Sequence, residues 1–413
     1  MSQQVETAPV LTSCSIPEIE RLEESQPILI STADARIDPA WDDAVATVLG
    51  GDLVQTTRWA ATRQQIGMRV HHLRLFTPDG TILAGCLIQC RRILPGIWVG
   101  AVPRGPLLFT EEPNLADRLV SELMRTARAA GLVLLIVRPA EGQEAQLRPA
   151  LHAAGFRPGG PPISPGATIR IDLHRSEEEI LRSAHPRRRT HIRNALRSGL
   201  ECRISDDVET FHRLHMASAR RSGFPPVWIG NLKAQWAILA PAGLCQLIEV
   251  RHDGAPIAAE WLTCFGGIVS SKMKGQDLSN IPATPASKVT GTAAVWASIC
   301  WARLVGAQYF DFSGFDRAAA EAIAKGQKLP HNLPPHDQIK WSFGGEVVLL
   351  PQSYFASPNG LAQYLLGGFV LPILNSHAIR RLMGRLRATP AGVFGRGAHH
   401  EPGAKPKSKR TAL

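Results

Sequence analysis

A strand and loop in the second half of the chain carry the residue types best suited to chemistry. Residues 308–312 alternate acidic and aromatic side chains, as a short strand does, and Asp311 lies near its end. A turn at Gly314 and then Asp316 follow, and a polar loop leads to Lys340. Carboxylates beside a lysine can take up a proton and hold a negative oxygen atom, so we predict a site at this strand end. For Asp311, a cap on the following turn is the alternative.

A basic stretch precedes this segment. Arg189, Arg193 and Arg197 are four residues apart, so on a helix they lie along one face. Guanidinium groups bind phosphate oxygen atoms in pairs, which favours a phosphate-rich partner. A face that is merely exposed to water is the alternative.

The net charge of +11 is concentrated at the end of the chain. Residues 376–413 contain nine lysines and arginines against one acid, Glu401. Such a tail attracts polyanions such as RNA or acidic lipid headgroups. The alternative is a solubilising tail without a partner.

Several common chemistries have no motif here. The sequence contains no GxSxG, no GxxxxGK[ST] and no HExxH pattern. His212 and His215 lack an accompanying set of ligands, and His331, His336 and Asp337 suggest a metal by composition alone. We therefore expect no bound metal.

The order of the predicted elements repeats once. A strand meander, a helix and a strand follow one another in residues 71–137, and the same order recurs in residues 245–312. This predicts an α/β (α+β) fold of two similar domains, each a mixed, largely antiparallel sheet flanked by helices. We expect a flexible leader (1–27), a first domain (28–165), a second domain (166–345), a return segment that packs on the first domain (346–375) and a basic, disordered tail (376–413).

The cellular location is predicted from what the sequence lacks. We found no secretory signal and no apolar run of 18 residues, and the seven scattered cysteines are typical of reduced thiols in the cytoplasm. The apolar stretch 361–374 is too short to span a bilayer. It is either a core segment or an interfacial anchor at the inner membrane.

Four patches resemble the FemA/FemB/FemX-type family of peptidyltransferases, which have a GNAT-like acyltransferase fold. The similarity extends over residues 40–355. The patches are WVGAVPRGPLLF (98–109), RRRTHIRNALRSGLECRI (187–204), TPASKVTGTAAVWASICWARLVGAQYFDFSGFD (284–316) and DQIKWSFGGEVV (337–348).

The resemblance implies two tandem GNAT-like domains that move an aminoacyl group from charged tRNA to an amine of a peptidoglycan precursor. By position, Arg63 and Arg221 would hold the phosphates of that precursor, and Lys340 matches the family lysine that faces the reacting ester. The aminoacyl ester is already activated, so no cofactor and no covalent nucleophile are expected. Lys340 would stabilise the oxyanion, and Asp311 or Asp316 would orient the amine or accept its proton. We count Gly314, Arg189 and Arg193 among the substrate-binding residues.

Two places depart from the family. Ile339 precedes Lys340 where the family has an aromatic residue, which could stack on a terminal adenine. Lys272 and Lys274 lie on a meander strand that is rich in tyrosine in many members, so we expect these lysines to alter the acceptor.

Two other functions remain open. An acyl-CoA-dependent N-acyltransferase of the same fold would use acetyl-CoA on a polysaccharide or small-molecule amine. It usually has a [QR]xxGx[GA] turn, which we do not find at 112–115 or 284–288, and this favours tRNA. A non-catalytic module that binds RNA or membrane would keep the arginines without needing Lys340.

Overall fold

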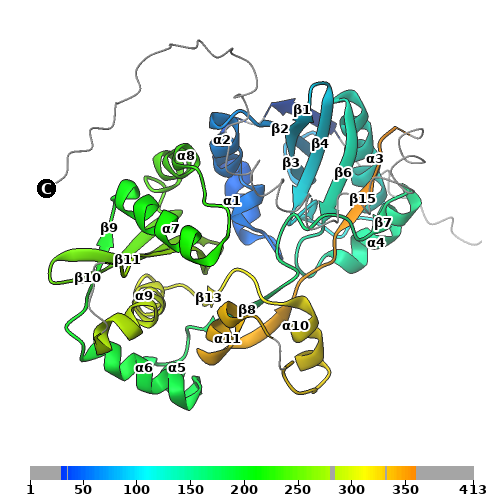
Figure 1. The fold of residues 1–413 in the computed structure, drawn as a ribbon. Helices are drawn as coiled ribbons and strands as arrows, with labels where there is room; N and C mark the ends of the chain where they lie inside the picture. The colour runs from blue at the N-terminus through cyan, green and yellow to red at the C-terminus, as the bar shows by residue number, and fades with distance from the viewer. Residues whose placement is uncertain (1–28, 35, 280–283, 331–332, 360–413) are drawn as a thin grey trace, which may run out of the picture.

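The computed structural model describes residues 29–34, 36–279, 284–330 and 333–359, which form two halves, each built on its own sheet (Figure 1). The predicted leader, the stretch 361–374 and the basic tail lie outside the described residues.

The first sheet has eight strands, and its main path runs in the order β1-β2-β3-β4-β6-β15-β7, with β5 paired to β3. The strands are β1 (Leu29–Asp34), β2 (Arg69–Phe76), β3 (Ile82–Leu94), β4 (Ile97–Pro103), β5 (Leu107–Leu108), β6 (Leu132–Arg138), β7 (Arg157–Pro158) and β15 (Tyr354–Ala356). All pairs are antiparallel except β4 with β6, which pair along the whole of β4 apart from Ile97.

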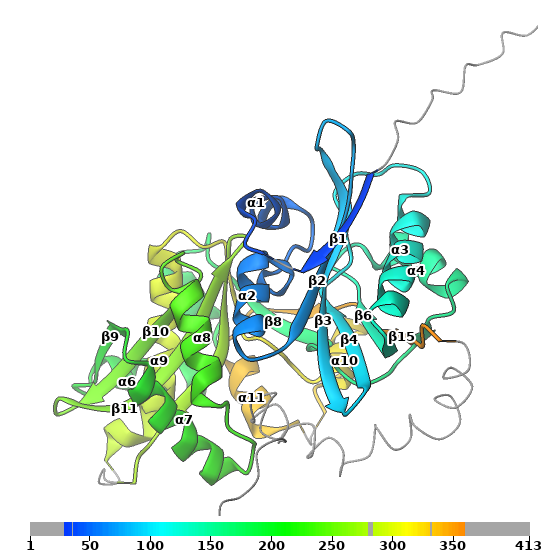
Figure 2. The same ribbon diagram turned by 90° about the horizontal axis from the view of Figure 1, so that it is seen from above.

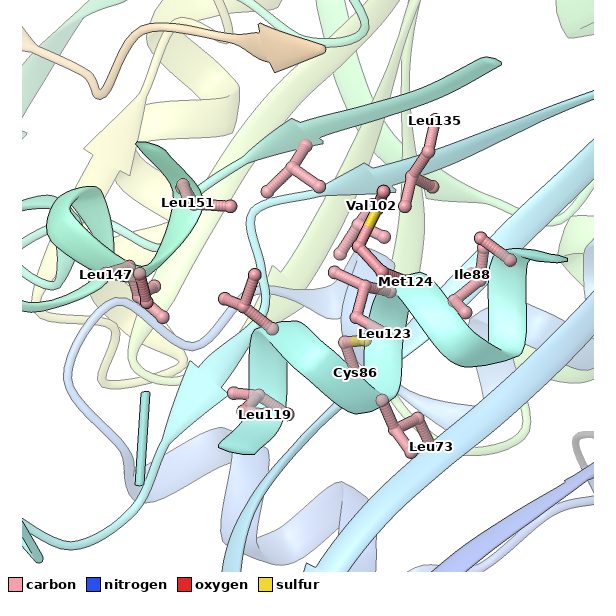
Figure 3. Close-up of a cluster of buried hydrophobic side chains, with 14 of the residues drawn as sticks. Leu73, Cys86, Ile88, Val102, Leu119, Leu123, Met124, Leu135, Leu147 and Leu151 are labelled. Atoms are coloured by element: carbon pink, nitrogen blue, oxygen red, sulfur yellow. The ribbon is translucent and has the colours of Figure 1, made fainter. Parts of the chain in front are cut away.

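Helices cover both faces of this sheet. They are α1 (Pro39–Thr47), the 3₁₀ helix η1 (Leu53–Gln55), α2 (Thr57–Gln65), α3 (Leu115–Ala129) and α4 (Glu144–Ala153). α3 presents apolar residues at helical spacing to the sheet. In Figure 3, Leu119, Leu123 and Met124 of this helix lie among core residues that include Leu73, Cys86, Ile88, Val102 and Leu135.

The second sheet repeats the arrangement in the order β14-β8-β13-β12-β11-β10-β9. Its strands are β8 (Ala167–Asp172), β9 (Glu201–Ser205), β10 (Cys245–His252), β11 (Ala255–Phe265), β12 (Ile268–Gln276), β13 (Tyr309–Asp311) and β14 (Glu346–Leu349). All pairs are antiparallel except β12 with β13. The predicted fold of two mixed, largely antiparallel sheets flanked by helices is confirmed.

The helices of this half form two layers. They are α5 (Glu177–Ser183), α6 (Pro186–Leu196), α7 (Val208–Ser222), α8 (Ile229–Leu239), α9 (Pro285–Leu304), α10 (Arg317–Ala324) and α11 (Pro335–Ser342). α6, α9 and α10 share one core with the sheet, while α7 and α8 share another. α7 and α9 therefore cover opposite faces of the second sheet.

The chain crosses between the halves twice, and two arginines hold the crossings together. Arg138 donates to the Pro165 carbonyl (2.5 Å) and to the Ser353 hydroxyl (2.9 Å). Arg317 donates to the carbonyl groups of Gly166 (3.2 Å) and Leu350 (2.8 Å).

The return to the first half starts later than we expected. β14 lies within the predicted return segment, 346–375, yet it pairs with β8 in the second sheet. In the described part of that segment, which ends at Asn359, only β15 joins the first sheet, between β6 and β7, where Figure 1 shows it beside β6. Among the described residues, no helix is long and apolar enough to cross a membrane.

Candidate active site

The second sheet opens between β12 and β13, and a cavity lies in the opening. The two strands pair only from Ile268–Tyr309 to Ser270–Asp311, whereas β12 continues to Gln276. Residues 271–276 line a cavity of about 1020 Å³. Because α7 and α9 also line it, the cavity reaches from one face of the sheet to the other.

The cavity lining is strongly cationic. Among the described residues that line it there is no Asp or Glu, but there are seven cations: Arg187, Arg188, Arg221, Lys272, Lys274, Lys288 and Lys340. Four histidines also line it: His185, His191, His215 and His336. Such a lining attracts polyanionic ligands.

Lys340 lies on α11 at the β13 side of the opening. Its Nζ donates to the Gly314 carbonyl (2.5 Å) and lies 3.6 Å from Oδ1 of Asp337. Burial above all lowers the pKa of Lys340, and the opposing effect of Asp337 is smaller. Asp337 is 4% exposed, and its Oδ1 has no hydrogen-bond partner among the described residues, so Lys340 is a main source of positive charge for it.

Asp311 shapes the turn that carries Gly314. Its carboxylate accepts hydrogen bonds from the Thr168 hydroxyl (2.7 Å), Arg170 Nε (2.9 Å) and the Ser313 N–H (2.6 Å). Asp311 does not line the cavity. These contacts match the capping role, which the sequence analysis gave as the alternative for Asp311.

Asp316 is the N-cap of α10, where its side chain accepts from the Ala319 N–H (2.8 Å). It too lies outside the cavity lining. The structure therefore does not bring the two predicted carboxylates together with Lys340 at the cavity surface.

Lys274 lies across the opening, backed by a carboxylate that we did not predict. Glu260 of β11 is fully buried, accepts hydrogen bonds from the hydroxyl groups of Ser271 and Ser298, and lies 3.3 Å from the Lys274 ammonium. Lys272 is the extra residue of a bulge, because Trp261 pairs with Met273 while the next residue, Leu262, pairs with Ser271. The bulge turns Ser271 and Lys274 to the same side of β12.

The first half interacts electrostatically with this strand through Asp52. Burial raises the pKa of Asp52, but Lys272 and Arg104 more than offset that effect, and the pKa lies below its ordinary value. Arg104 belongs to the patch WVGAVPRGPLLF (98–109), and its Nε lies 3.7 Å from Oδ2 of Asp52. This patch therefore lies at the boundary between the halves, where Arg104 and Lys272 both stabilise the charge of Asp52.

Arg221, which we predicted to bind substrate, lines the cavity from α7 and donates to the Gln276 carbonyl (3.1 Å). Beside it, His215 donates from Nδ1 to the Lys274 carbonyl (2.9 Å), and its Nε2 accepts from the Val227 N–H (3.3 Å). Burial lowers the pKa of His215, so a neutral imidazole holds β12 against α7.

The basic stretch lines the cavity with different arginines from those predicted. Arg189 donates to the carbonyl groups of Arg182 and Ala184, at the end of α5, and Arg193 is exposed away from the cavity lining. Arg188 instead reaches the Ser342 and Thr292 hydroxyls, joining α6, α11 and α9. In the sequence, only the position of Arg188 directly before Arg189 could have pointed to this role.

Arg63 lies away from the cavity. It is buried on α2 beneath Asn231 of α8, to which its Nη2 donates (2.8 Å), and its guanidinium lies 4.4 Å from the Trp59 ring. Burial lowers its pKa to about 10. Arg63 therefore contributes to the contact between the two halves.

No group of three or more potential metal ligands occurs among the described residues. His331 lies outside them, and His336 lies 3.6 Å from Asp337 at the cavity.

Comparisons with known proteins agree with this geometry. A model described as the FemAB family matches residues 44–149, and one described as the acetyltransferase (GNAT) domain matches residues 186–321. No curated protein matches the sequence.

Two solved structures are similar in fold. FemX has a TM-score of 0.66 at 16% identity, covering 82% of this chain and 99% of its own. A tandem GNAT protein from the clavulanic acid biosynthesis pathway has a TM-score of 0.50 at 12% identity, covering 81% and 99%. The first half thus matches the FemAB family, the second half matches the acetyltransferase (GNAT) domain, and the two together have the fold of FemX.

Proposed function

We propose that this transferase moves an aminoacyl group from charged tRNA to an amine of a peptidoglycan precursor, as a FemX-like enzyme in the cytoplasm. The supporting observation is the cavity, which carries seven cations and, among the described residues that line it, no acid. Both proposed substrates are polyanions, and a lining of one charge sign attracts them and holds their phosphates.

The proposed reaction needs positioning rather than a covalent nucleophile. The acceptor amine attacks the ester carbonyl, a carbon–nitrogen bond forms, and the bond to the terminal ribose oxygen breaks. The amine loses a proton and the ribose oxygen gains one. Lys340, held by Gly314 and Asp337, supplies a positive charge for the oxyanion of the intermediate.

The cavity has two sides, one at each face of the second sheet, so each substrate can have its own side. Arg221, Ser218 and Phe224 line it on the α7 side, and Arg188 and Lys288 line it on the α9 side. We propose that donor and acceptor enter from opposite faces and meet at β12, beside Lys274 and Lys340. Arg221 then takes the phosphate-binding role, and Arg63 supports the helix contact behind it.

The test is direct transfer. Purified protein is incubated with tRNA charged with labelled amino acids and with a nucleotide-linked peptidoglycan precursor, and the labelled product is separated by chromatography. Label in the precursor supports the proposal. Turnover of acetyl-CoA alone, or tight RNA binding without turnover of any donor, would contradict it.

One observation favours acyl-CoA as a second candidate donor. Ser287, Lys288, Gly291 and Thr292, in the first half of α9, line the cavity. A helix N-terminus beside a lysine suits a pyrophosphate. The acetyl-CoA arm of the same experiment decides between the donors.

A further inference from the structure

The hairpin of β3 and β4 projects beyond the rest of the first sheet. β2 begins to pair with β3 at Arg69–Cys90, and β6 begins to pair with β4 at Leu132–Trp98. Residues 91–97 therefore extend past both neighbouring strands. Figure 2 shows the two strands running on together at this end of the sheet.

The hairpin tip is apolar and exposed. Leu94 is 58% exposed and Ile97 is 38% exposed, on either side of the Pro95-Gly96 turn. An aliphatic pair that is this exposed at a projecting tip marks a surface suited to an apolar partner.

The base of the same tip is basic. Arg91 and Arg92 precede the turn, and the Arg69 guanidinium lies 4.0 Å from the Trp98 ring. Residues 82–103 contain no Asp or Glu. An apolar tip with arginines and a tryptophan at its base has the composition of an interfacial membrane contact.

The chain leaves the described part of the protein at this same end. β15 runs antiparallel to β6, so it heads toward the start of β6, where Trp98 also pairs. The Pro358 carbonyl accepts from Arg128 in the last turn of α3, just before β6. The sequence beyond Asn359 begins with the apolar stretch 361–374 and continues with nine lysines and arginines.

We propose that this end of the first half binds an anionic lipid surface. Leu94 and Ile97 enter the headgroup layer, and the surrounding arginines contact lipid phosphates. RNA would use the arginines but has no use for an aliphatic tip. The sequence that follows Asn359 is itself basic, so it would repel the arginines of the hairpin. An anionic surface attracts both the hairpin and that sequence. This inference does not depend on the donor or acceptor proposed above.

The experiment uses the full chain and sedimentation with vesicles. Vesicles of phosphatidylcholine alone are compared with vesicles containing phosphatidylglycerol, at physiological salt. We expect binding to the anionic vesicles, and at least a tenfold weaker partition for Leu94→Ser/Ile97→Ser. The matched control is Leu304→Ser/Val305→Ser, which removes an even more exposed apolar pair (83% and 53%) from the second half and should bind as the parent does.

Circular dichroism checks that both variants are folded. Unchanged binding by the hairpin variant would overturn the proposal, since the tail alone would then account for it. Failure of the parent to bind anionic vesicles would overturn it too, as would a hairpin variant that loses RNA binding or self-association instead.

Discussion

Two lysines that line the opening, Lys340 and Lys274, each have a buried carboxylate behind them. Asp337 lies behind Lys340, and Glu260 lies behind Lys274. A charge that must leave water is tolerated when it is paired, so each carboxylate offsets part of the cost of burying its lysine. The two ammonium groups also repel each other, which contributes to the lowered pKa of Lys340. An anionic group between them would relieve that repulsion.

Replacing Lys340 tests the oxyanion role. We expect Lys340→Ala to lower the transfer rate by about 100-fold or more, since one donor to an oxyanion is worth roughly that much. Lys233→Ala, which removes an exposed lysine from α8, is the control and should retain full activity. Labelled-product formation is measured for both, and an active Lys340→Ala enzyme would exclude the assigned role.

Asp311 offers a test between capping and proton transfer. If it caps the turn, Asp311→Asn should cost about 1–3 kcal/mol of unfolding free energy through its buried hydrogen bonds. The folded variant should then keep turnover within about tenfold of the parent, since a lost general base costs about 100-fold or more. Urea unfolding and the transfer rate are measured together; a stable variant without turnover would indicate the base.

The sequence identifies the charges of the site better than their partners. Lys340, Lys272, Lys274 and Arg221 do line the cavity. Lys272 and Lys274 do so from a strand of the predicted meander, whereas Lys340 lies on α11, where we expected a loop. The role of Arg188 in place of Arg189 depends on the rotation of α6, which Ile192 and Ala195 fix by packing into the core. Glu260 gave no signal, because a lone acid in an apolar strand shows its partners only after folding.

At the scale of elements, the opening depends on how closely β12 approaches α7. A Cβ on Gly275 would lie 2.6 Å from the His215 backbone nitrogen, so only glycine fits there. Gly291 of α9 faces open space, since nothing lies within 4 Å of a Cβ at that position.

The two glycines therefore make a matched pair. We expect Gly275→Ala to destabilise the protein by about 1–3 kcal/mol, because α7 must shift. Gly291→Ala should stabilise it by about 0.5–1 kcal/mol, because alanine is the better helix former. Chemical unfolding of both variants is the measurement, and an equal effect on the two would contradict the described contact.

Elements with a clear local sequence pattern could be predicted, whereas a strand that depends on partners far away in the sequence could not. The meander and the helix predicted within residues 245–312 correspond to β10, β11 and β12 and to α9. β8 was missed because its partners, β13 and β14, come more than 130 residues later in the chain. Its sequence, ATIRID, is too short to mark a strand without them.

At the scale of the whole molecule, His72 makes stability depend on pH. It is 5% exposed between the first sheet and Trp41, whose ring centre lies 4.5 Å away. Burial foremost, with Arg74, lowers its pKa to about 4, and Asp38 opposes this only partly. The folded state therefore disfavours the proton that the unfolded chain takes up near pH 6.5.

The sign of the effect follows. Stability is complete above about pH 6.5 and falls as the pH drops toward 4, by about 3 kcal/mol in total from this group. His72→Phe, which keeps an aromatic ring beside Trp41, should flatten the profile by that amount. Denaturant midpoints between pH 4 and 8 measure it, and an unchanged slope would show that another group is responsible.

The position of β15 has a consequence for synthesis. β6 and β7 are separated in the sheet by a strand that the ribosome makes about 200 residues later. Until residue 356 has emerged, the first sheet has an unfilled slot beside β6, where another strand can add. The second half must be translated before the first can close, so a message truncated within the second half yields a nascent chain that exposes β6 to chaperones and proteases.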